Sequence, residues 1–202
     1  SGHTRCITKV IVISNEDDEN QFLLSCSEDC QIILWDLKTG KELLSLFDRD
    51  CNTLCKINVP QDTVYSRKFA ITTEYNSIKI WNVSSQGKVS QCHTIENAHS
   101  DCIRALLYSP SDQVLISASD DCTIKFWQMN FAGKASHKLL FTIHNPFDKP
   151  CYTLAFLDNE NCSLVVVADF SGNILVINVK TGECQTQIQN KCPNIVWNFA
   201  VY

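Results

Sequence analysis

Residues 27–36 read SEDCQIILWD, and residues 119–128 read SDDCTIKFWQ. Between them, residues 73–82 read TEYNSIKIWN, with the same order of polar and apolar positions. Trp35, Trp81 and Trp127 are therefore separated by 46 residues in both intervals. A fourth, degenerate copy at residues 169–179 reads DFSGNILVINV and has Ile177 at the tryptophan position. This self-similarity identifies the chain as a repeat protein.

The rest of the chain carries the signals of β-strands. Apolar residues occur in short runs rich in Val, Ile, Phe and Thr, such as residues 8–14, 32–35, 78–81 and 164–167, and Asp, Asn, Ser and Gly interrupt them. Runs of this length and composition predict strands, and no stretch has a useful helical stripe. No apolar run reaches the roughly 18 residues that a membrane span needs. The sequence therefore predicts an all-β protein without a membrane span.

The repeats resemble the WD40 family. The tryptophan is followed by Asp36 in the first copy, and by Asn82 and Gln128 as departures in the next two. A strand rich in Ser and Thr precedes an acidic turn, and an upstream Gly2-His3 or Ala98-His99 pair stands where the family has Gly-His. The resemblance covers nearly the whole chain and implies a β-propeller with four antiparallel strands in each blade.

On this resemblance the chain forms one WD40-type propeller segment with four blades and one extra strand. The expected boundaries are about 1–47, 48–95, 96–143 and 144–189 for the blades, and 190–202 for the first strand of a next blade. Propellers close so that no long sheet edge stays bare. We therefore expect the chain to be part of a larger propeller ring. The alternatives are that a partner chain supplies the missing blades, or that two copies form a homodimer.

Charge and cysteine content limit the classes of partner and cofactor. The net charge is −5, and the basic residues are dispersed rather than gathered into the stripe that nucleic-acid binding needs. Of the 12 cysteines, Cys30 and Cys122 occupy the same turn position, which indicates buried or turn thiols in a reducing cytoplasmic or nuclear compartment. The cysteine spacings lack the paired Cys-x2-Cys halves of a structural zinc site. We expect no metal and no cofactor.

Two copies contain a histidine, a serine, an aspartate and a tryptophan in the same order, a set that invites comparison with a catalytic triad. The WD40 resemblance instead implies a structural hydrogen-bond network that holds each blade together. Such a network recurs in several blades, whereas a catalytic triad normally occurs once in a protein. The second copy has Ile71 and Tyr75 at the serine and aspartate positions, and the fourth has Ser171 for the aspartate, so we expect packing alone to hold those blades. The eight network residues are His3, Ser25, Asp29, Trp35, His99, Ser117, Asp121 and Trp127.

In WD40 proteins the loops before each first strand and the turns between the second and third strands share one face, on which many partners dock. Interface energy concentrates in arginine and aromatic residues. Carrying these positions over predicts a partner-binding set, with Asp101 and Asp120 giving charge selectivity. Its members are Arg5, Tyr75, Asp101, Asp120, Phe147 and Phe170.

These features predict a non-catalytic scaffold that presents a loop face to protein or peptide partners in a multi-subunit assembly. No glycine-rich phosphate loop, zinc-protease helix or nucleophile elbow is present in the sequence. Two alternatives remain open. One is a substrate receptor of a ubiquitin ligase, although Lys38 replaces the arginine of the usual Trp-Asp-x-Arg signature. The other is a regulatory propeller of a nucleotide-binding signalling protein.

Overall fold

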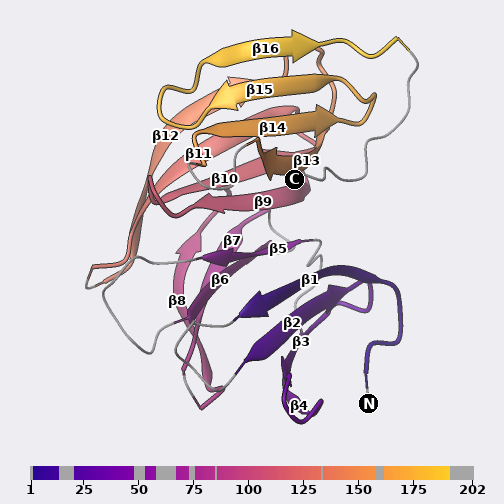
Figure 1. The fold of residues 1–202 in the computed structure, drawn as a ribbon, viewed down its shortest axis with the longest axis vertical. Coiled ribbons are helices and arrows are strands. Elements are labelled where there is room, and N and C mark those ends of the chain that lie inside the picture. The colour runs from indigo at the N-terminus through magenta and orange to yellow at the C-terminus, as the bar shows by residue number, and fades with distance from the viewer. Residues whose placement is uncertain are drawn as a thin grey trace. The chain divides into compact units, whose positions relative to one another are not determined.

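The computed structural model describes residues 2–13, 21–47, 53–57, 67–72, 76–84, 86–132, 134–157 and 162–191. Every regular element in these residues is a β-strand, and the strands form four sheets of four (Figure 1). In each sheet the strands follow one another in chain order and are antiparallel. The chain divides into two units, Ser1–Ala98 and His99–Tyr202, and each contains two sheets.

The first unit holds the first and second blades. The strands of the first blade are β1 (Ile7–Ile13), β2 (Phe22–Ser27), β3 (Gln31–Asp36) and β4 (Glu42–Phe47). Those of the second blade are β5 (Leu54–Ile57), β6 (Arg67–Thr72), β7 (Ile78–Val83) and β8 (Val89–Ile95).

The second unit holds the third and fourth blades. The strands of the third blade are β9 (Ile103–Ser109), β10 (Val114–Ser119), β11 (Thr123–Asn130) and β12 (Ser136–His144). Those of the fourth blade are β13 (Cys151–Phe156), β14 (Leu164–Asp169), β15 (Ile174–Asn178) and β16 (Cys184–Ile188).

The four blades share one turn geometry between their second and third strands. The residue five positions before each tryptophan slot has a positive φ, namely 63° at Cys30, 51° at Asn76, 63° at Cys122 and 78° at Gly172. This left-handed conformation suits glycine and asparagine best, so the two cysteines stand at a backbone position that strains an ordinary side chain. The repeated turn explains why these two cysteines are equivalent in the sequence.

A second shared feature is an irregularity in the pairing of the third and fourth strands. The register shifts directly before the tryptophan slot in every blade, at Trp35, Trp81, Trp127 and Ile177. A bulge at this place increases the local twist of the blade. The fourth blade keeps both features although isoleucine replaces its tryptophan, so the repeat is preserved in the backbone where the sequence is degenerate.

Each blade has two faces, which we call the tryptophan face, carrying the tryptophan slot, and the opposite face. In the first unit, Leu24 and Leu34 on the opposite face of the first blade form one buried cluster with Phe69, Ile71 and Trp81 on the tryptophan face of the second. Residues directly across an antiparallel pair lie on the same face, which fixes these assignments.

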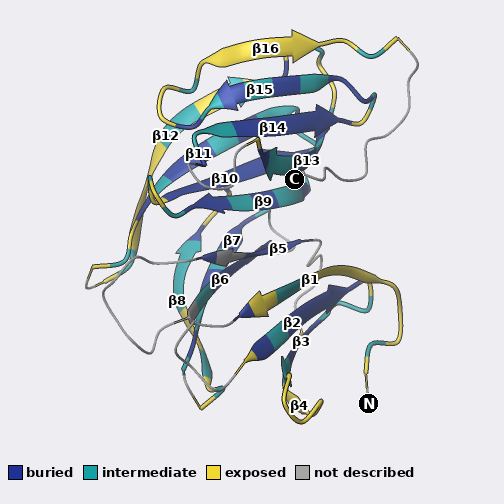
Figure 2. Cartoon of the chain, in the orientation of Figure 1, coloured by how far each residue is buried: buried dark blue, intermediate teal, exposed yellow. Residues whose placement is uncertain are grey.

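The second unit repeats this arrangement. Ile116 and Phe126 on the opposite face of the third blade pack in one cluster with Val165 and Ile177 on the tryptophan face of the fourth. Figure 2 shows the burial concentrated in the inner strands, while β4 and β16 at the sheet edges are largely exposed.

The predicted all-β fold with four four-stranded WD40-type blades is confirmed. Residues 192–202, which hold most of the predicted extra strand, lie outside the described residues.

Candidate functional site

The first of two histidine-centred hydrogen-bond groups lies in the first blade. Nδ1 of His3 lies 3.1 Å from both carboxylate oxygens of Asp29, and Nε2 lies 2.7 Å from Oγ of Ser25. The indole N–H of Trp35 donates to the same Oγ at 2.8 Å. A carboxylate only accepts, so the proton of the imidazole sits on Nδ1 and the serine hydroxyl donates to Nε2. The group thereby connects the loop before β1 with β2, the following turn and β3.

The third blade contains the second group with the same connections. Nδ1 of His99 lies 2.9 Å from Asp121, and Nε2 lies 2.7 Å from Oγ of Ser117. The indole N–H of Trp127 donates to that hydroxyl at 3.0 Å. Ser117 is fully buried, and His99 is 4% exposed. All eight side chains of the predicted network therefore lie in two hydrogen-bonded groups of four.

Both aspartates have a lowered pKa. Burial raises the pKa of Asp29, but the backbone N–H groups of Thr4 and Gln31 and the side chain of His3 outweigh it and bring the pKa to about 2. Burial likewise opposes ionisation of Asp121, but hydrogen bonds from His99 and Thr123 hold its pKa far below the ordinary value of 3.8. Both groups are thus carboxylates near neutral pH.

This electrostatic arrangement predicts a specific loss of stability in acid. Below their ordinary pKa of 3.8 the two aspartates bind protons more readily in the unfolded chain than in the native protein, so stability falls as the pH drops from about 4 towards 2. Urea unfolding at pH 7, 4, 3 and 2 measures this loss. An Asp29→Asn/Asp121→Asn protein is less stable at pH 7 and is expected to depend less on pH in this window. Equal acid sensitivity of the two proteins would refute the assignment.

The fourth blade corrects the expectation that packing alone holds it. Asp169, which is 2% exposed, accepts N–H bonds from Ser171 at 2.8 Å and from the backbone and side chain of Asn173 at 2.9 and 2.8 Å. The side-chain amide of Asn145 in the loop before β13 also donates to Asp169, at 3.1 Å. Ser171 stands where the first and third blades have their aspartate, and Asp169 lies two positions before it. The carboxylate of Asp169 thus takes the role of that aspartate, and the side-chain amide of Asn145 takes the role of the histidine.

The described residues of the second blade contain no such replacement at its tryptophan. Ile71 stands at the serine position and is fully buried. Within the described residues, the buried Nε1 of Trp81 has no hydrogen-bond partner. This follows directly from the sequence, because isoleucine offers no acceptor to the indole N–H.

A second cluster of side chains lies on the loops and strand ends of the third and fourth blades. Nε of Arg104, at the start of β9, donates to Asp120 in the turn after β10 at 2.8 Å, and Nη2 donates to the same oxygen. The hydrogen bond with Asp120 is the main reason that the pKa of Arg104 is raised. Strand β13 packs against β9 and β10, and Arg104 and Tyr152 are the second residues of β9 and β13. Tyr152 in turn meets the ring of Phe170 edge to face, with centroids 6.3 Å apart.

We call Asp101, Arg104, Asp120, Tyr152 and Phe170 the loop face. Phe170 is 51% exposed, and the side chain of Arg104 is 36% exposed. Phe170 is held by its backbone N–H, which donates to the carbonyl of Pro150 at 2.9 Å. An accessible arginine and an accessible aromatic ring on a fixed backbone are the residue types that dominate binding at protein interfaces.

The six residues predicted to bind a partner are distributed over both units. Asp101, Asp120 and Phe170 belong to the loop face. Phe147 is half-buried and packs against the core of the second unit, so part of its ring serves the fold. Arg5 is exposed in the first unit, and Tyr75 lies outside the described residues.

Sequence reasoning missed Arg104 and Tyr152. Each follows the first residue of its blade's first strand, and those first residues, Ile103 and Cys151, are buried at 2% and 0% exposure. The strand pairing shifts register at both places, between Ile103 and Ala105 in β9 and between Cys151 and Thr153 in β13. Such an irregularity breaks the alternation of side chains and re-aims one of them, so strand periodicity in the sequence does not reveal either residue.

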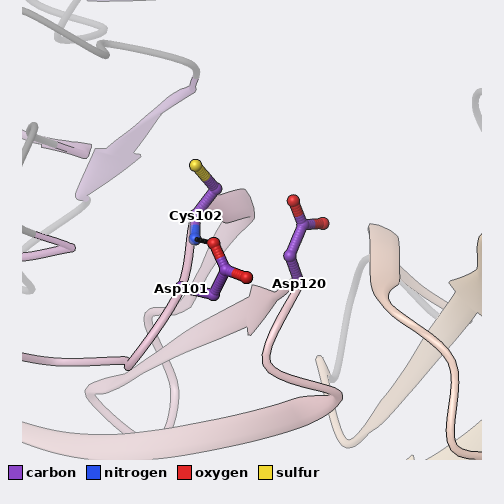
Figure 3. Close-up of side chains that lie close together, drawn as sticks. All are labelled: Asp101, Cys102 and Asp120. Carbon is purple, nitrogen blue, oxygen red and sulfur yellow. Dashed lines mark hydrogen bonds between the residues drawn. The ribbon is translucent and has the colours of Figure 1, made fainter.

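Asp101, Cys102 and Asp120 bring potential metal-ligand atoms within 4.8 Å of one another (Figure 3). Oδ1 of Asp101 already accepts the backbone N–H of Cys102 at 2.7 Å. The guanidinium of Arg104 neutralises Asp120 and would repel a cation bound beside it. The arrangement suits an ion pair with one additional carboxylate better than a metal centre.

Comparison with known proteins identifies the repeats. Residues 1–36 and 90–128 match the family model described as WD domain, G-beta repeat. Polyadenylation factor subunit 2 of Neurospora crassa is 40% identical over 75 residues, which are 37% of this chain and 11% of that protein. Human apoptotic protease-activating factor 1 is 26% identical over 117 residues, or 57% of this chain and 8% of that protein.

A further relative is nuclear distribution protein PAC1 of Arthroderma otae, which is 26% identical over 155 residues, or 74% of this chain and 32% of that protein. The chain thus spans a third or less of the length of each of these relatives. In the part of the chain that the structure describes, no helix is long and apolar enough to span a membrane. The matched segments contain all eight residues of the two histidine-centred groups, and they show that the chain contains WD40 repeats, which form WD40-type β-propeller blades.

Proposed function

We propose that this chain is a non-catalytic scaffold whose loop face binds a protein or peptide partner within a larger assembly. The observation that carries the proposal is the loop face itself, where half-exposed Phe170 meets Tyr152 edge to face and the neighbouring strand β9 carries the Arg104–Asp120 ion pair. The name of one relative, polyadenylation factor subunit 2, describes a subunit, which fits a role in an assembly.

The two histidine-centred groups support a structural role over a catalytic one. A nucleophilic serine must reach its substrate, but Ser25 and Ser117 are 2% and 0% exposed. Each hydroxyl also accepts an indole N–H, from Trp35 or Trp127. Burial and full hydrogen bonding suit a brace that stabilises the blade, because buried polar groups are costly unless paired.

We also propose that the protein works in a reducing compartment, cytoplasmic or nuclear. Ten cysteines lie in the described residues, and all ten are free thiols. Burial raises the pKa of Cys55 to about 12, so its thiol stays protonated and behaves as a small apolar side chain.

Affinity capture with quantitative mass spectrometry tests the proposed binding role. An Arg104→Ala/Phe170→Ala protein is expected to lose about tenfold or more of a stoichiometric partner, since truncating hot-spot residues costs roughly 2 kcal/mol or more each. The matched control is Lys134→Ala/Leu139→Ala, which removes one exposed cation and one apolar side chain, Leu139, that is 43% exposed. Lys134 follows β11, at the end of that strand away from the loop face.

The control protein is expected to capture the partner as the unaltered chain does. Equal capture by all three proteins would show that the partner binds elsewhere. A thermal melt of each protein accompanies the assay, so that a loss caused by unfolding is recognised. If no stoichiometric partner is captured by the unaltered chain, the scaffold proposal itself fails.

A further inference from the structure

The negative charge of the second unit is concentrated at one end. Residues 99–104, 120–122, 145–152 and 169–173 lie in the loops before β9 and β13, the turns after β10 and β14 and the strand residues beside them, and we call them the loop end. They include every residue of the loop face. In the sequence they hold five acidic and two basic side chains, whereas the rest of the unit holds four acidic and five basic ones. The charged residues of the loop end are Asp101, Asp120, Asp121, Asp148, Asp169, Arg104 and Lys149.

Two of these aspartates are buried, and their hydrogen bonds come from groups other than lysine or arginine. The side chain of Asp121 is 8% exposed, and Asp169 is 2% exposed. Asp121 accepts from the imidazole of His99 and from backbone and hydroxyl groups, and Asp169 accepts from amide groups. Burial raises the pKa of the Cys122 thiol in the turn after β10, and the charges of three aspartates, Asp121 among them, raise it further.

The other three aspartates differ in what they offer to a partner. Asp120 is paired with Arg104 and is thereby neutralised. Asp101 is exposed and lies beside Asp120, with oxygen atoms of the two within 4.8 Å of each other (Figure 3). The side chain of Asp148 is 86% exposed. Since a carboxylate accepts several hydrogen bonds, Asp101 and Asp148 are open to donors from a partner.

Aromatic rings stand next to these carboxylates. By register, Tyr152 and Phe170 of the fourth blade occupy the positions that Arg104 and Asp120 occupy in the third. Strand β13 packs against β9 and β10, so the aromatic pair adjoins the ion pair. A ring attracts a cation to its face, and the long stems of arginine and lysine are apolar. The two halves of the loop face thus suit the two parts of a basic side chain.

We propose that the partner segment bound by the loop face is basic, with an arginine or lysine side chain paired to Asp101 and an apolar side chain on Phe170. This inference rests on the proposed binding role of the loop face and names the chemistry of its partner. A basic segment is attracted by the excess of aspartates, whereas an acidic segment meets a surface of its own sign. Arginine suits the site better than lysine, because its planar guanidinium bonds a carboxylate through two N–H groups and stacks on aromatic rings.

Fluorescence polarisation at 50 mM NaCl tests the proposal with two labelled peptides. One reads Gly-Arg-Leu-Arg-Leu-Arg-Gly, and the other has citrulline in place of each arginine, which keeps the shape and removes the charge. The arginine peptide is expected to bind about tenfold more tightly. Asp101→Asn/Asp148→Asn is expected to remove most of this difference, because it weakens binding of the arginine peptide and leaves that of the citrulline peptide unchanged.

Glu42→Gln/Glu183→Gln is the matched control. It removes two exposed carboxylates at the starts of β4 and β16, after the turns at the other end of the third strands. The control is expected to bind both peptides as the unaltered chain does, and thermal melts establish that both variants are folded. Equal affinity of the unaltered chain for the two peptides, or no binding of either, overturns the proposal. So does an equal effect of the two double substitutions.

The partner-capture assay separates this proposal from the binding role on which it rests. Asp101→Asn/Asp148→Asn is expected to lose the captured partner together with Arg104→Ala/Phe170→Ala. If the first protein retains the partner and only the second loses it, the loop face binds its partner but the inference of a basic segment is overturned.

Discussion

Asp121→Ala is expected to lower the free energy of unfolding by about 3 to 5 kcal/mol, because it leaves the buried imidazole of His99 and three further donors without their acceptor. The carboxylate accepts from Nδ1 of His99 at 2.9 Å, from the backbone N–H of Ser100 at 3.1 Å, and from the backbone and hydroxyl of Thr123 at 2.9 and 2.6 Å. Alanine supplies none of these acceptors. Urea unfolding and the melting temperature measure the loss.

Asp148→Asn provides the control for this change. The Asp148 side chain is 86% exposed and lies 3.8 Å from His144, and its φ of 53° is a conformation that asparagine also adopts, so this substitution is expected to change stability by less than about 0.5 kcal/mol. If Asp121→Ala melts at the same temperature as the unaltered chain, the histidine-centred group is not a brace.

Gly182→Ala is expected to cost about 2 to 4 kcal/mol, the sum of an unfavourable backbone conformation and overpacking. Gly182 has φ of +72°, and a Cβ there would lie 2.9 Å from Cγ of Phe141. Phe141 packs edge to face on Phe126, which is fully buried, at a centroid distance of 6.0 Å. A displaced Phe141 ring would therefore disturb the core of the second unit.

Gly40→Ala separates the two contributions. Gly40 occupies the equivalent Lys-Thr-Gly turn and has φ of +67°. A Cβ added to Gly40 would have no atom within 4 Å. In both turns the glycine N–H donates to the carbonyl of a residue four positions earlier, at 2.8 Å for Gly40 and 2.9 Å for Gly182. We expect Gly40→Ala to cost about 1 kcal/mol, from the backbone alone. Equal losses of unfolding free energy at the two sites would show that the Phe141 ring moves aside without measurable cost.

The blades could be predicted from the sequence because each repeat encodes its own local structure. Apolar alternation, the acidic turn and the tryptophan slot all indicate the same four-stranded sheet, and agreement among such signals is a mark of a well-specified fold. That Nε1 of Trp81 finds no acceptor among the described residues could also be anticipated, because isoleucine stands at the serine position.

In the fourth blade, comparing the repeats position by position does not predict which residue accepts the hydrogen bonds of the turn. Its acceptor, Asp169, stands at the position of Ser119 and not of Asp121, and a carboxylate shifted by two residues reaches the same turn amides by a different path. A side chain can hydrogen-bond to turn amides from more than one position in the sequence. A serine at the aspartate position therefore does not mean that the turn lacks a carboxylate acceptor.

The loop face was predicted in part for a related reason. Asp101, Asp120 and Phe170 are loop or turn residues and were accessible to a search of loops. Arg104 and Tyr152 lie within strands, and only their contacts with Asp120 and Phe170 show that they belong to the same surface. Contacts between residues of different strands depend on the packed fold, which sequence spacing does not contain.

We propose that the loop face binds a partner while the histidine-centred groups hold the blades together. Partner capture and thermal melting of the same proteins, at a temperature where all are folded, test it most directly. We expect that Arg104→Ala/Phe170→Ala loses the partner with little change in melting temperature, and that Asp121→Ala melts lower by about 10 °C yet retains the partner. The reverse pattern, with the partner retained by the first protein and lost by the folded second one, would contradict it.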